Sequence, residues 1–275
     1  IIVWSLYLDT HGNPESVDLS FQPQLESQDL SESGQFYPNM KFNHNSISYN
    51  IESTCNQKKQ DRMLSAFQEL SNMINEISFY SVSANPDIEI SCSEKSNNNS
   101  MNKKNYFIAG EGGAKEIVQT GAYNVIINGL ILLYENKRVV KCDTPNIELH
   151  ELIHVLGFGH SENENSLMYP YLQSCNQKLD ESIIKEIKRL YSEENLPDLY
   201  FENLKVIKKG RYIDFNITIK NSGTLDAENI KFDILDGTES IQDKKIDELR
   251  FGAGIIFETK NLKLNSRNSK EIEFI

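Results

Sequence analysis

Residues 150–160 combine histidine, glutamate and glycine at spacings that suit metal chemistry, reading His-Glu-Leu-Ile-His-Val-Leu-Gly-Phe-Gly-His. On a helix, His150 and His154 lie one turn apart on the same face, so both imidazoles can reach one ion. The chain must then turn back to supply a third ligand, and Gly157 permits the positive φ of such a turn. His160 completes a three-histidine site whose fourth position is open to water, as in catalytic zinc centres.

Glu151 follows the first of these histidines directly, which places its carboxylate beside the ion rather than on it. We therefore predict one catalytic Zn²⁺ ion, with Glu151 as the general base that takes a proton from the attacking water and passes it to the leaving amine. Two histidines one turn apart occur by accident in many helices. The five fixed positions of the full pattern, however, coincide in a chain of this length with a probability on the order of 1 in 100,000.

Hydrophobic periodicity predicts the elements that must position this motif. Residues 46–51, 78–82 and 87–91 have the pattern of strands. A helix of about five turns is predicted between the first two strands from an apolar repeat at helical spacing. That repeat consists of Met63, Leu64, Phe67, Leu70, Met73, Ile74 and Ile77. A further helix is predicted around residues 183–191, after the motif.

Two glycine-containing segments before the motif are interpreted as turns. Gly-Glu-Gly-Gly at residues 110–113 lacks the lysine and hydroxyl residue of a phosphate-binding loop, so we interpret it as a glycine-rich turn. Asn128-Gly129 divides two strand-like runs within residues 123–134, which predicts a hairpin at that pair.

The chain divides into three parts by composition and hydrophobic periodicity, which predicts an α+β fold followed by a small all-β domain. Residues 1–40 are interpreted as an N-terminal lead-in, which is polar and loop-rich from residue 10 onward. Residues 41–195 hold the helical periodicity and the metal motif. Residues 197–275 alternate in the manner of strands and predict an independent β-sandwich.

Composition limits the partners. The chain has 275 residues, of which 39% are hydrophobic, enough for a real core, and its 40 acidic and 28 basic residues give a net charge of −12. That charge repels phosphate backbones, so nucleic acid is excluded as a partner. The opening Ile-Ile-Val-Trp-Ser-Leu-Tyr-Leu suits either a buried first strand or a segment that follows a signal or a membrane anchor upstream of residue 1. Nothing in the sequence indicates the oligomeric state.

The motif resembles the metzincin clan of zinc peptidases and, in detail, its matrixin family. Ser161 follows the third histidine as in that family, and Ser166-Leu167-Met168-Tyr169-Pro170 resembles the family's Met-turn. The resemblance implies a twisted mixed sheet with long helices and places Met168 as the apolar floor beneath the metal. It also implies that the neighbouring residues form the wall of the substrate pocket. These wall residues are Tyr169, Pro170 and Tyr171.

The tail resembles a different family. Phe215-Asn216-Ile217-Thr218-Ile219-Lys220-Asn221-Ser222-Gly223-Thr224 is similar to the cell-adhesion-related (CARDB-like) immunoglobulin-like domains of bacterial surface proteins. Such modules bind or space rather than catalyse, so this resemblance implies an immunoglobulin-like sandwich without site chemistry.

Four cysteines without Cys-x-x-Cys spacing fit two disulfides and an extracytoplasmic, secreted or surface-anchored protein, although four free buried thiols would suit a cytosolic one. We predict a Cys142–Cys175 bridge, because the first precedes the metal helix and the second follows the Met-turn that folds back beneath the same metal. Cys55 and Cys92 then pair between the first long helix and the sheet below it.

These observations together predict a zinc metalloendopeptidase that acts on peptide or protein substrates. An alternative from another class is a surface or adhesion protein whose metzincin domain binds zinc but does not cleave, and the intact Glu151 favours the enzyme. A zinc hydrolase of non-peptide amides is a third reading, because the activated water attacks any acyl group within reach.

Overall fold

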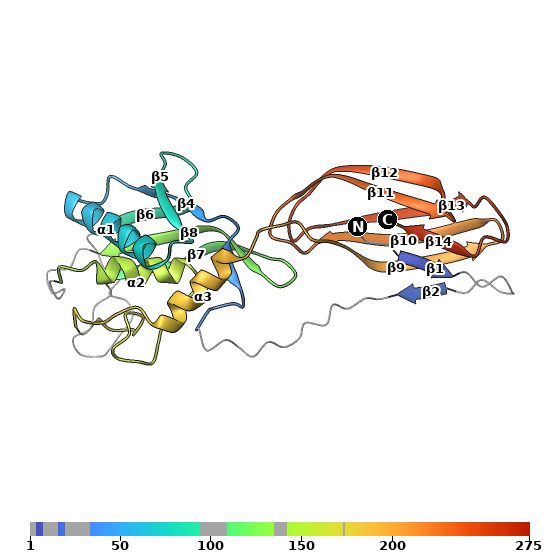
Figure 1. Cartoon of the computed structure of the whole chain (residues 1–275). Coiled ribbons are helices and arrows are strands. Elements are labelled where there is room, and N and C mark those ends of the chain that lie inside the picture. The colour runs from blue at the N-terminus through green and yellow to red at the C-terminus, as the bar shows by residue number, and fades with distance from the viewer. Residues whose placement is uncertain (1–3, 8–15, 20–33, 94–108, 135–141, 173) are drawn as a thin grey trace. The chain divides into compact units, whose positions relative to one another are not determined.

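The computed structural model describes residues 4–7, 16–19, 34–93, 109–134, 142–172 and 174–275. They divide into two units, each described by itself (Figure 1). The first, called the α+β unit, lies within residues 27–119 and 123–194, and the second, called the β unit, lies within residues 1–26, 120–122 and 195–275.

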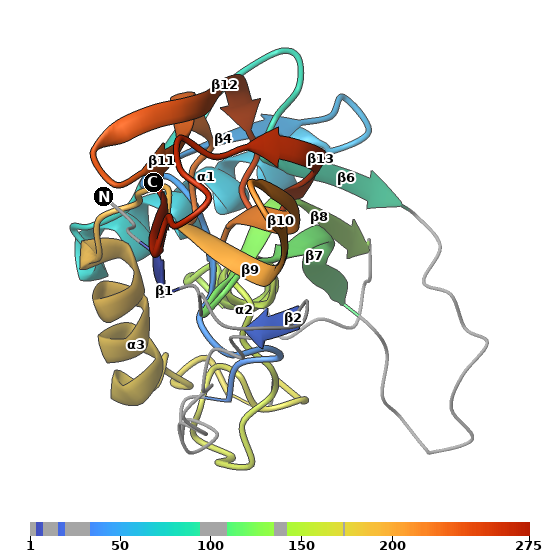
Figure 2. The same ribbon diagram turned by 90° about the vertical axis from the view of Figure 1, so that its right-hand side faces the viewer.

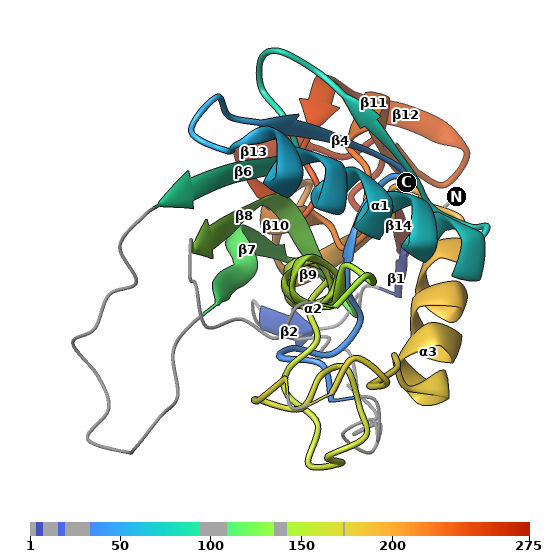
Figure 3. The ribbon, with the colours of Figure 1, turned by 90° about the vertical axis from the view of Figure 1, so that its left-hand side faces the viewer.

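A sheet of mostly parallel strands forms the centre of the α+β unit. The elements of this unit are β3 (Met40–Phe42), β4 (Ser46–Ile51), α1 (Gln57–Met73), β5 (Ser78–Ser81), β6 (Ile88–Ser93), β7 (Gly110–Gln119), β8 (Asn124–Tyr134), α2 (Asn146–Val155) and α3 (Glu181–Ser192). The sheet order is β3-β8-β6-β4-β5, and β7 pairs with β8. Among the strand pairs that the structure describes in this unit, only β7–β8 is antiparallel. Figure 3 shows β6, β8 and β7 in succession across the sheet.

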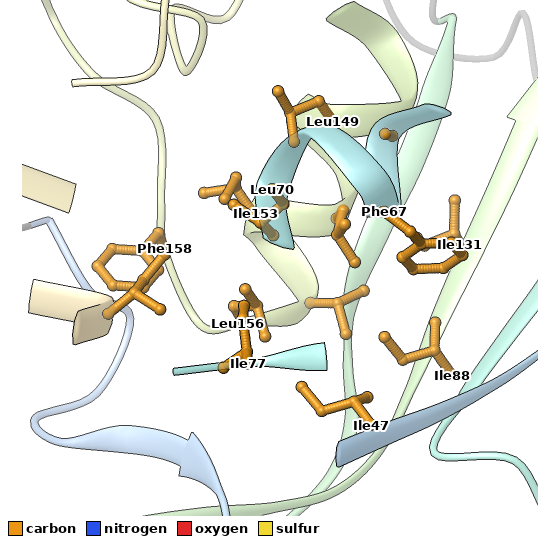
Figure 4. Packing of buried hydrophobic residues seen from close by; sticks show 14 of the residues in the cluster. Ile47, Phe67, Leu70, Ile77, Ile88, Ile131, Leu149, Ile153, Leu156 and Phe158 are labelled. Carbon is orange, nitrogen blue, oxygen red and sulfur yellow. The ribbon is translucent and has the colours of Figure 1, made fainter. Parts of the chain in front are cut away.

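Helix α1 forms where the apolar repeat predicted a helix. Its N-cap Asn56 accepts a hydrogen bond from the backbone N–H of Lys59, and its last turn closes where the Ile74 N–H donates to Leu70 O. The face it buries consists of Met63, Ala66, Phe67 and Leu70, at the i, i+3, i+4, i+7 spacing of one helix face. These side chains and those of α2 cover one face of the sheet and share its core (Figure 4).

Three glycines let α2 lie directly on the sheet. A Cβ on Gly112 would lie 2.3 Å from the backbone O of Glu151, and one on Gly129 would lie 2.5 Å from a methyl of Val155. A Cβ on Gly110 would meet the Glu151 side chain at 2.8 Å. The helix and the strands therefore approach more closely than a side chain at these three positions would permit.

Both turn interpretations of these glycine segments are wrong. Residues 110–113 begin strand β7, and Asn128-Gly129 lies inside strand β8, while the β7–β8 connection falls at residues 120–123. Turn chemistry and close helix–sheet packing both select glycine, and the local sequence does not distinguish them.

Helix α3 joins the sheet through a buried lysine. Figures 2 and 3 show α2 almost end-on and α3 from the side, so the two helices cross. Lys41 on β3 donates to Leu190 O near the end of α3 at 2.6 Å, and its ammonium lies 5.8 and 5.7 Å from the ring centres of Tyr123 and Tyr191. The Tyr191 hydroxyl accepts from the Phe42 N–H. Burial lowers the pKa of Lys41, but the helix carbonyl and the two rings compensate its charge.

A buried ion pair fastens α2 to α1. Glu148 in the first turn of α2 is 0% exposed and accepts a hydrogen bond from Arg62 Nε of α1 at 3.0 Å, with Lys59 Nζ at 3.9 Å. Arg62 also donates to the carbonyls of Cys142 and Thr144, just before α2. One guanidinium thus orders the approach to the metal motif and the start of its helix.

Two antiparallel sheets of four strands make up the β unit, in the orders β1-β14-β11-β12 and β13-β10-β9-β2. Its strands are β1 (Trp4–Tyr7), β2 (Ser16–Leu19), β9 (Leu199–Lys209), β10 (Tyr212–Asn221), β11 (Ala227–Asp236), β12 (Glu239–Leu249), β13 (Gly254–Lys263) and β14 (Glu271–Phe274). Figure 1 shows β11 and β12 in one layer and β9 and β10 in the other. One hydrophobic core joins the two sheets, so the unit is a β-sandwich.

The lead-in assigned to residues 1–40 differs from the structure. Strands β1 and β2 pair with β14 and β9 of the β unit, and β3 begins at Met40 in the α+β unit. Strand β1 lies in the apolar opening run, for which a first strand is one of the two interpretations. Strand β2 lies among polar residues and carries too little alternation to be recognised without its partner β9. In the described part of the chain no helix has the length and apolar character needed to cross a membrane.

The close approach of α2 predicts a site-specific effect of adding one methyl group. Gly112→Ala should lower the free energy of unfolding by about 1–3 kcal/mol, because the new Cβ meets backbone that no side-chain rotation can move. Gly113→Ala is the matched control, since a Cβ there meets nothing within 4 Å. Urea titration of both variants measures the difference, and equal effects would contradict the packing argument.

Arg62→Met should be strongly destabilising, by about 3–5 kcal/mol, because it leaves the buried Glu148 carboxylate with Lys59 alone as its cationic neighbour. Arg189→Met removes a surface arginine that pairs with Glu186 and Glu193, and it should cost about 1 kcal/mol or less. Thermal and urea unfolding compare the two variants. A loss of similar size in both would show that burial of Glu148 adds nothing to the pair.

Candidate metal centre

Helix α2 carries the first two predicted ligands and the predicted base, and all ten of its residues are buried. Past its end, the Gly157 N–H donates to His154 O and the Phe158 N–H donates to Ile153 O. Gly157 has φ +96°, and a Cβ there would lie 2.7 Å from the Met40 side chain. Glycine is therefore required at this position twice over, by the backbone and by the packing.

The turn brings the three histidines together as predicted. His154 Nε2 lies 3.0 Å from His150 Nε2 and 3.2 Å from His160 Nε2. Among the described residues, these three side chains form the one cluster whose ligand atoms could hold a metal ion, with all of those atoms within 4.8 Å of one another.

Backbone carbonyls fix which nitrogen of each helix histidine faces the centre. His150 Nδ1 lies 2.7 Å from Leu167 O, and His154 Nδ1 lies 2.7 Å from Phe158 O. A carbonyl only accepts, so Nδ1 carries the proton and donates, which leaves a lone pair on each Nε2. This is the usual way in which proteins orient metal-binding imidazoles.

The donor set fits zinc. Two nitrogens that bind one tetrahedral ion at about 2.0–2.1 Å lie about 3.3 Å apart, close to the spacings found here. Lone pairs that converge at such distances repel unless a cation lies between them. The three imidazoles together leave one tetrahedral position for water or substrate.

Burial keeps the imidazoles in the form that binds metal. It lowers the pKa of His150 to about 4, and the neighbouring His154 and His160 add to this effect. The pKa values of His154 and His160 are also lowered by burial. All three side chains are therefore neutral ligands near neutral pH.

Glu151 lies against the glycines of β7. Its pKa is raised to about 8, first by burial and then by the negative charges of Glu111 and Glu148, while a hydrogen bond from the Gly112 N–H acts in the opposite direction. These surroundings raise the affinity of the carboxylate for a proton, and such strongly perturbed carboxyls are candidates for proton transfer.

The segment after His160 folds back to the histidine cluster, where Leu167 O contacts His150 Nδ1. Met168 is fully buried, its N–H donates to Ser166 Oγ, and its carbonyl accepts from the Ser161 N–H. Leu167, whose carbonyl orients His150, is itself held where its N–H donates to Lys178 O at 2.7 Å.

The neighbouring loop contains the three predicted pocket-wall residues. The Tyr169 and Tyr171 rings meet edge to face at 5.9 Å, around Pro170. The role of these three residues in substrate binding stays a prediction.

Two disulfides close the unit, Cys55–Cys92 and Cys142–Cys175, the pairs expected from the sequence. The second joins the approach to α2 with the loop below the centre. Asn146 at the start of α2 donates to Cys175 O across the same junction.

Sequence reasoning missed several residues that support the site. Gln177 donates from its amide to the carbonyls of Glu164, Ser166 and Tyr171, and Ser166 Oγ donates to Asp180. No periodicity marks such residues, because they bond to backbone in an irregular loop. The segment 34–36, which lies within the predicted lead-in, pairs with the turn at 157–159.

The parallel sheet under two helices, the three histidines at the end of the second helix and the buried methionine turn together define a zinc metallopeptidase domain of the metzincin type. Residues 41–192 match the family model of Matrixin, which is more than half of the chain. The chain belongs to the matrixin family. No curated protein matches it. Members of this family are zinc peptidases with peptide or protein substrates and are generally extracellular, a setting that the two disulfides fit.

The disulfide beside the centre should matter for metal binding as well as for stability. Replacing Cys142 and Cys175 by serine should lower the free energy of unfolding by about 3–4 kcal/mol and weaken zinc binding, because the loop that orients His150 loses its anchor. The matched Cys55 and Cys92 double variant should lose similar stability and keep zinc affinity. Competition with a zinc chelator measures affinity, and equal weakening in both variants would contradict this division.

Proposed function

We propose that this protein is an extracytoplasmic zinc endopeptidase, secreted or anchored at the cell surface, with one catalytic Zn²⁺ held by His150, His154 and His160. The observation that carries the proposal is the position of Glu151, buried between α2 and the glycines of β7 and adjacent in sequence to the first ligand. Burial and the negative charges of Glu111 and Glu148 raise the pKa of this carboxyl to about 8, and perturbed pKa values cluster at functional sites.

The roles of the residues follow from their surroundings. Zinc in such a site supplies the Lewis acidity that activates water and polarises a carbonyl. The histidines hold the site open on one side, and their Nδ1 hydrogen bonds to Leu167 O and Phe158 O prevent the rings from turning. Glu151 accepts the proton of the attacking water and returns it to the nitrogen of the leaving amine, so no proton is gained or lost overall.

The residues after Met168 are proposed to guide the substrate. Tyr169, Pro170 and Tyr171 form the wall of the pocket for the substrate side chain, and Met168 forms the floor beneath the ligands. The irregular segment between Ser166 and Lys178 is fastened by the Gln177 amide, which supports a pre-formed wall.

We further propose that the β unit is an immunoglobulin-like module of the CARDB type, which spaces or attaches the peptidase. Its two antiparallel sheets with a shared core are compatible with that architecture. The alternative function, a zinc-binding adhesion protein without activity, makes the opposite prediction about peptide cleavage.

Glu151→Gln should keep one zinc ion per chain and lower kcat/KM for peptide hydrolysis about 10²- to 10⁴-fold, because the amide preserves the packing and cannot take a proton. His154→Ala should lose both metal and activity. Metal content and cleavage of a mixed peptide library, with and without chelator, measure both properties. Full activity in the Glu151 variant would refute the assigned base, and an inactive zinc-loaded wild type would favour the adhesion protein.

A further inference from the structure

An N-terminal strap, defined here as residues 34–37, lies against the turn between the second and third histidines. The Phe36 N–H donates to Gly157 O at 2.8 Å, and the Gly159 N–H donates to Gly34 O at 2.8 Å. Gln35 and Phe158 form an antiparallel bridge between these two bonds. The strap thus forms a short antiparallel pairing with the turn. It precedes residue 41, where the match to the family model begins.

The strap places an aromatic ring on a metal ligand. The ring centres of Phe36 and His154 lie 5.9 Å apart with an interplanar angle of 28°, a stacked arrangement. Phe36 is nevertheless 54% exposed, so much of its surface stays open to whatever approaches the centre. Its neighbour Tyr37 is equally exposed, at 53%, and no ring contact joins it to a histidine within the described residues.

The ring is not needed to orient its histidine. His154 is already fixed where Nδ1 donates to Phe158 O at 2.7 Å, and its Nε2 lies among the other ligands. Gly159 keeps the strap close, because a Cβ there would lie 3.3 Å from Gly34 O and 3.4 Å from the Phe36 ring. An exposed apolar ring held beside a reaction centre by two backbone hydrogen bonds is therefore available for contact with substrate.

We propose that Phe36 is a specificity-determining residue that contacts a large apolar side chain of the peptide substrate, close to the bond that is cut. This inference rests on the proposed peptidase function. A bound peptide rises about 3.3–3.6 Å per residue, so a residue one or two positions from the scissile carbonyl reaches the level of a ring stacked on His154. Aromatic and aliphatic side chains gain from contact with such a ring, and small polar ones do not.

Cleavage of a positional peptide library tests the assignment in the full chain. Wild type should prefer large apolar residues at one position near the cut, and Phe36→Ala should reduce that preference about tenfold while leaving the other positions and the zinc content unchanged. Phe36→Leu should retain part of the preference. Tyr37→Ala, the matched control for an exposed strap aromatic, should change it less than twofold.

A purely structural role of Phe36 gives a different pattern. In that case Phe36→Ala would lower kcat for all peptides alike or lose zinc, and the positional preference would survive. Either result overturns the inference, as does a preference that Tyr37→Ala reduces as much as Phe36→Ala does.

A binding measurement separates this inference from the proposed function. In the Glu151→Gln background, where cleavage is suppressed, calorimetry compares octapeptides that carry phenylalanine in place of serine at one position at a time. One position should show a Kd about tenfold lower for phenylalanine with Phe36 present, and no difference with Phe36→Ala. If wild type cleaves nothing but this difference is found, the peptidase proposal fails and the contact stands. If no position depends on Phe36, the inference is wrong whatever the activity.

Discussion

The close contact between helix α2 and strands β7 and β8 is the constraint on which the rest of the site depends. The helix carries two of the three clustered histidines and the proposed base, Glu151, and all of these residues are buried. Glycines at positions 110, 112 and 129 make the contact attainable, because any Cβ there would enter the helix or its side chains. The same approach removes Glu151 from water and accounts for its high proton affinity.

Segments without regular secondary structure then complete the centre. The carbonyls that orient the two helix histidines come from Leu167 and Phe158, which lie in the loop and the turn after the helix. Both side chains are buried in the core of the α+β unit, and further contacts hold the backbone around them. Leu167 is held by Lys178, and the loop around it by Gln177 and the Cys142–Cys175 bridge. The metal geometry is thus a property of backbone positions that several distant residues stabilise together.

The two buried carboxylates of α2, Glu148 and Glu151, lie in different electrostatic surroundings. At its start, Glu148 is buried and compensated by Arg62, which also binds the carbonyls of Cys142 and Thr144. In the following turn, burial and the negative charges of Glu111 and Glu148 raise the pKa of Glu151. Glu148 is thus a structural anchor, whereas Glu151 has the raised proton affinity that suits its proposed role, and the cationic partner that helix α1 supplies to Glu148 makes part of this difference.

The sequence by itself predicted the cluster of three histidines, the main helices and strands of the α+β unit and the pairing of the four cysteines, all of which the structure contains. These features are encoded by spacing over a few residues, or by their place beside elements that spacing reveals, as with His150, His154 and Gly157. Only the tertiary structure decided why Gly112 and Gly129 are glycines, where β1 and β2 pair, and that the strap places Phe36 on His154. In the sequence, a glycine that packs against a helix cannot be distinguished from a glycine in a turn. A strand of four residues is too short to show which strand it pairs with. The physical reason is that contacts with residues far along the chain select the residue types at these positions, and a local sequence pattern does not reveal such contacts.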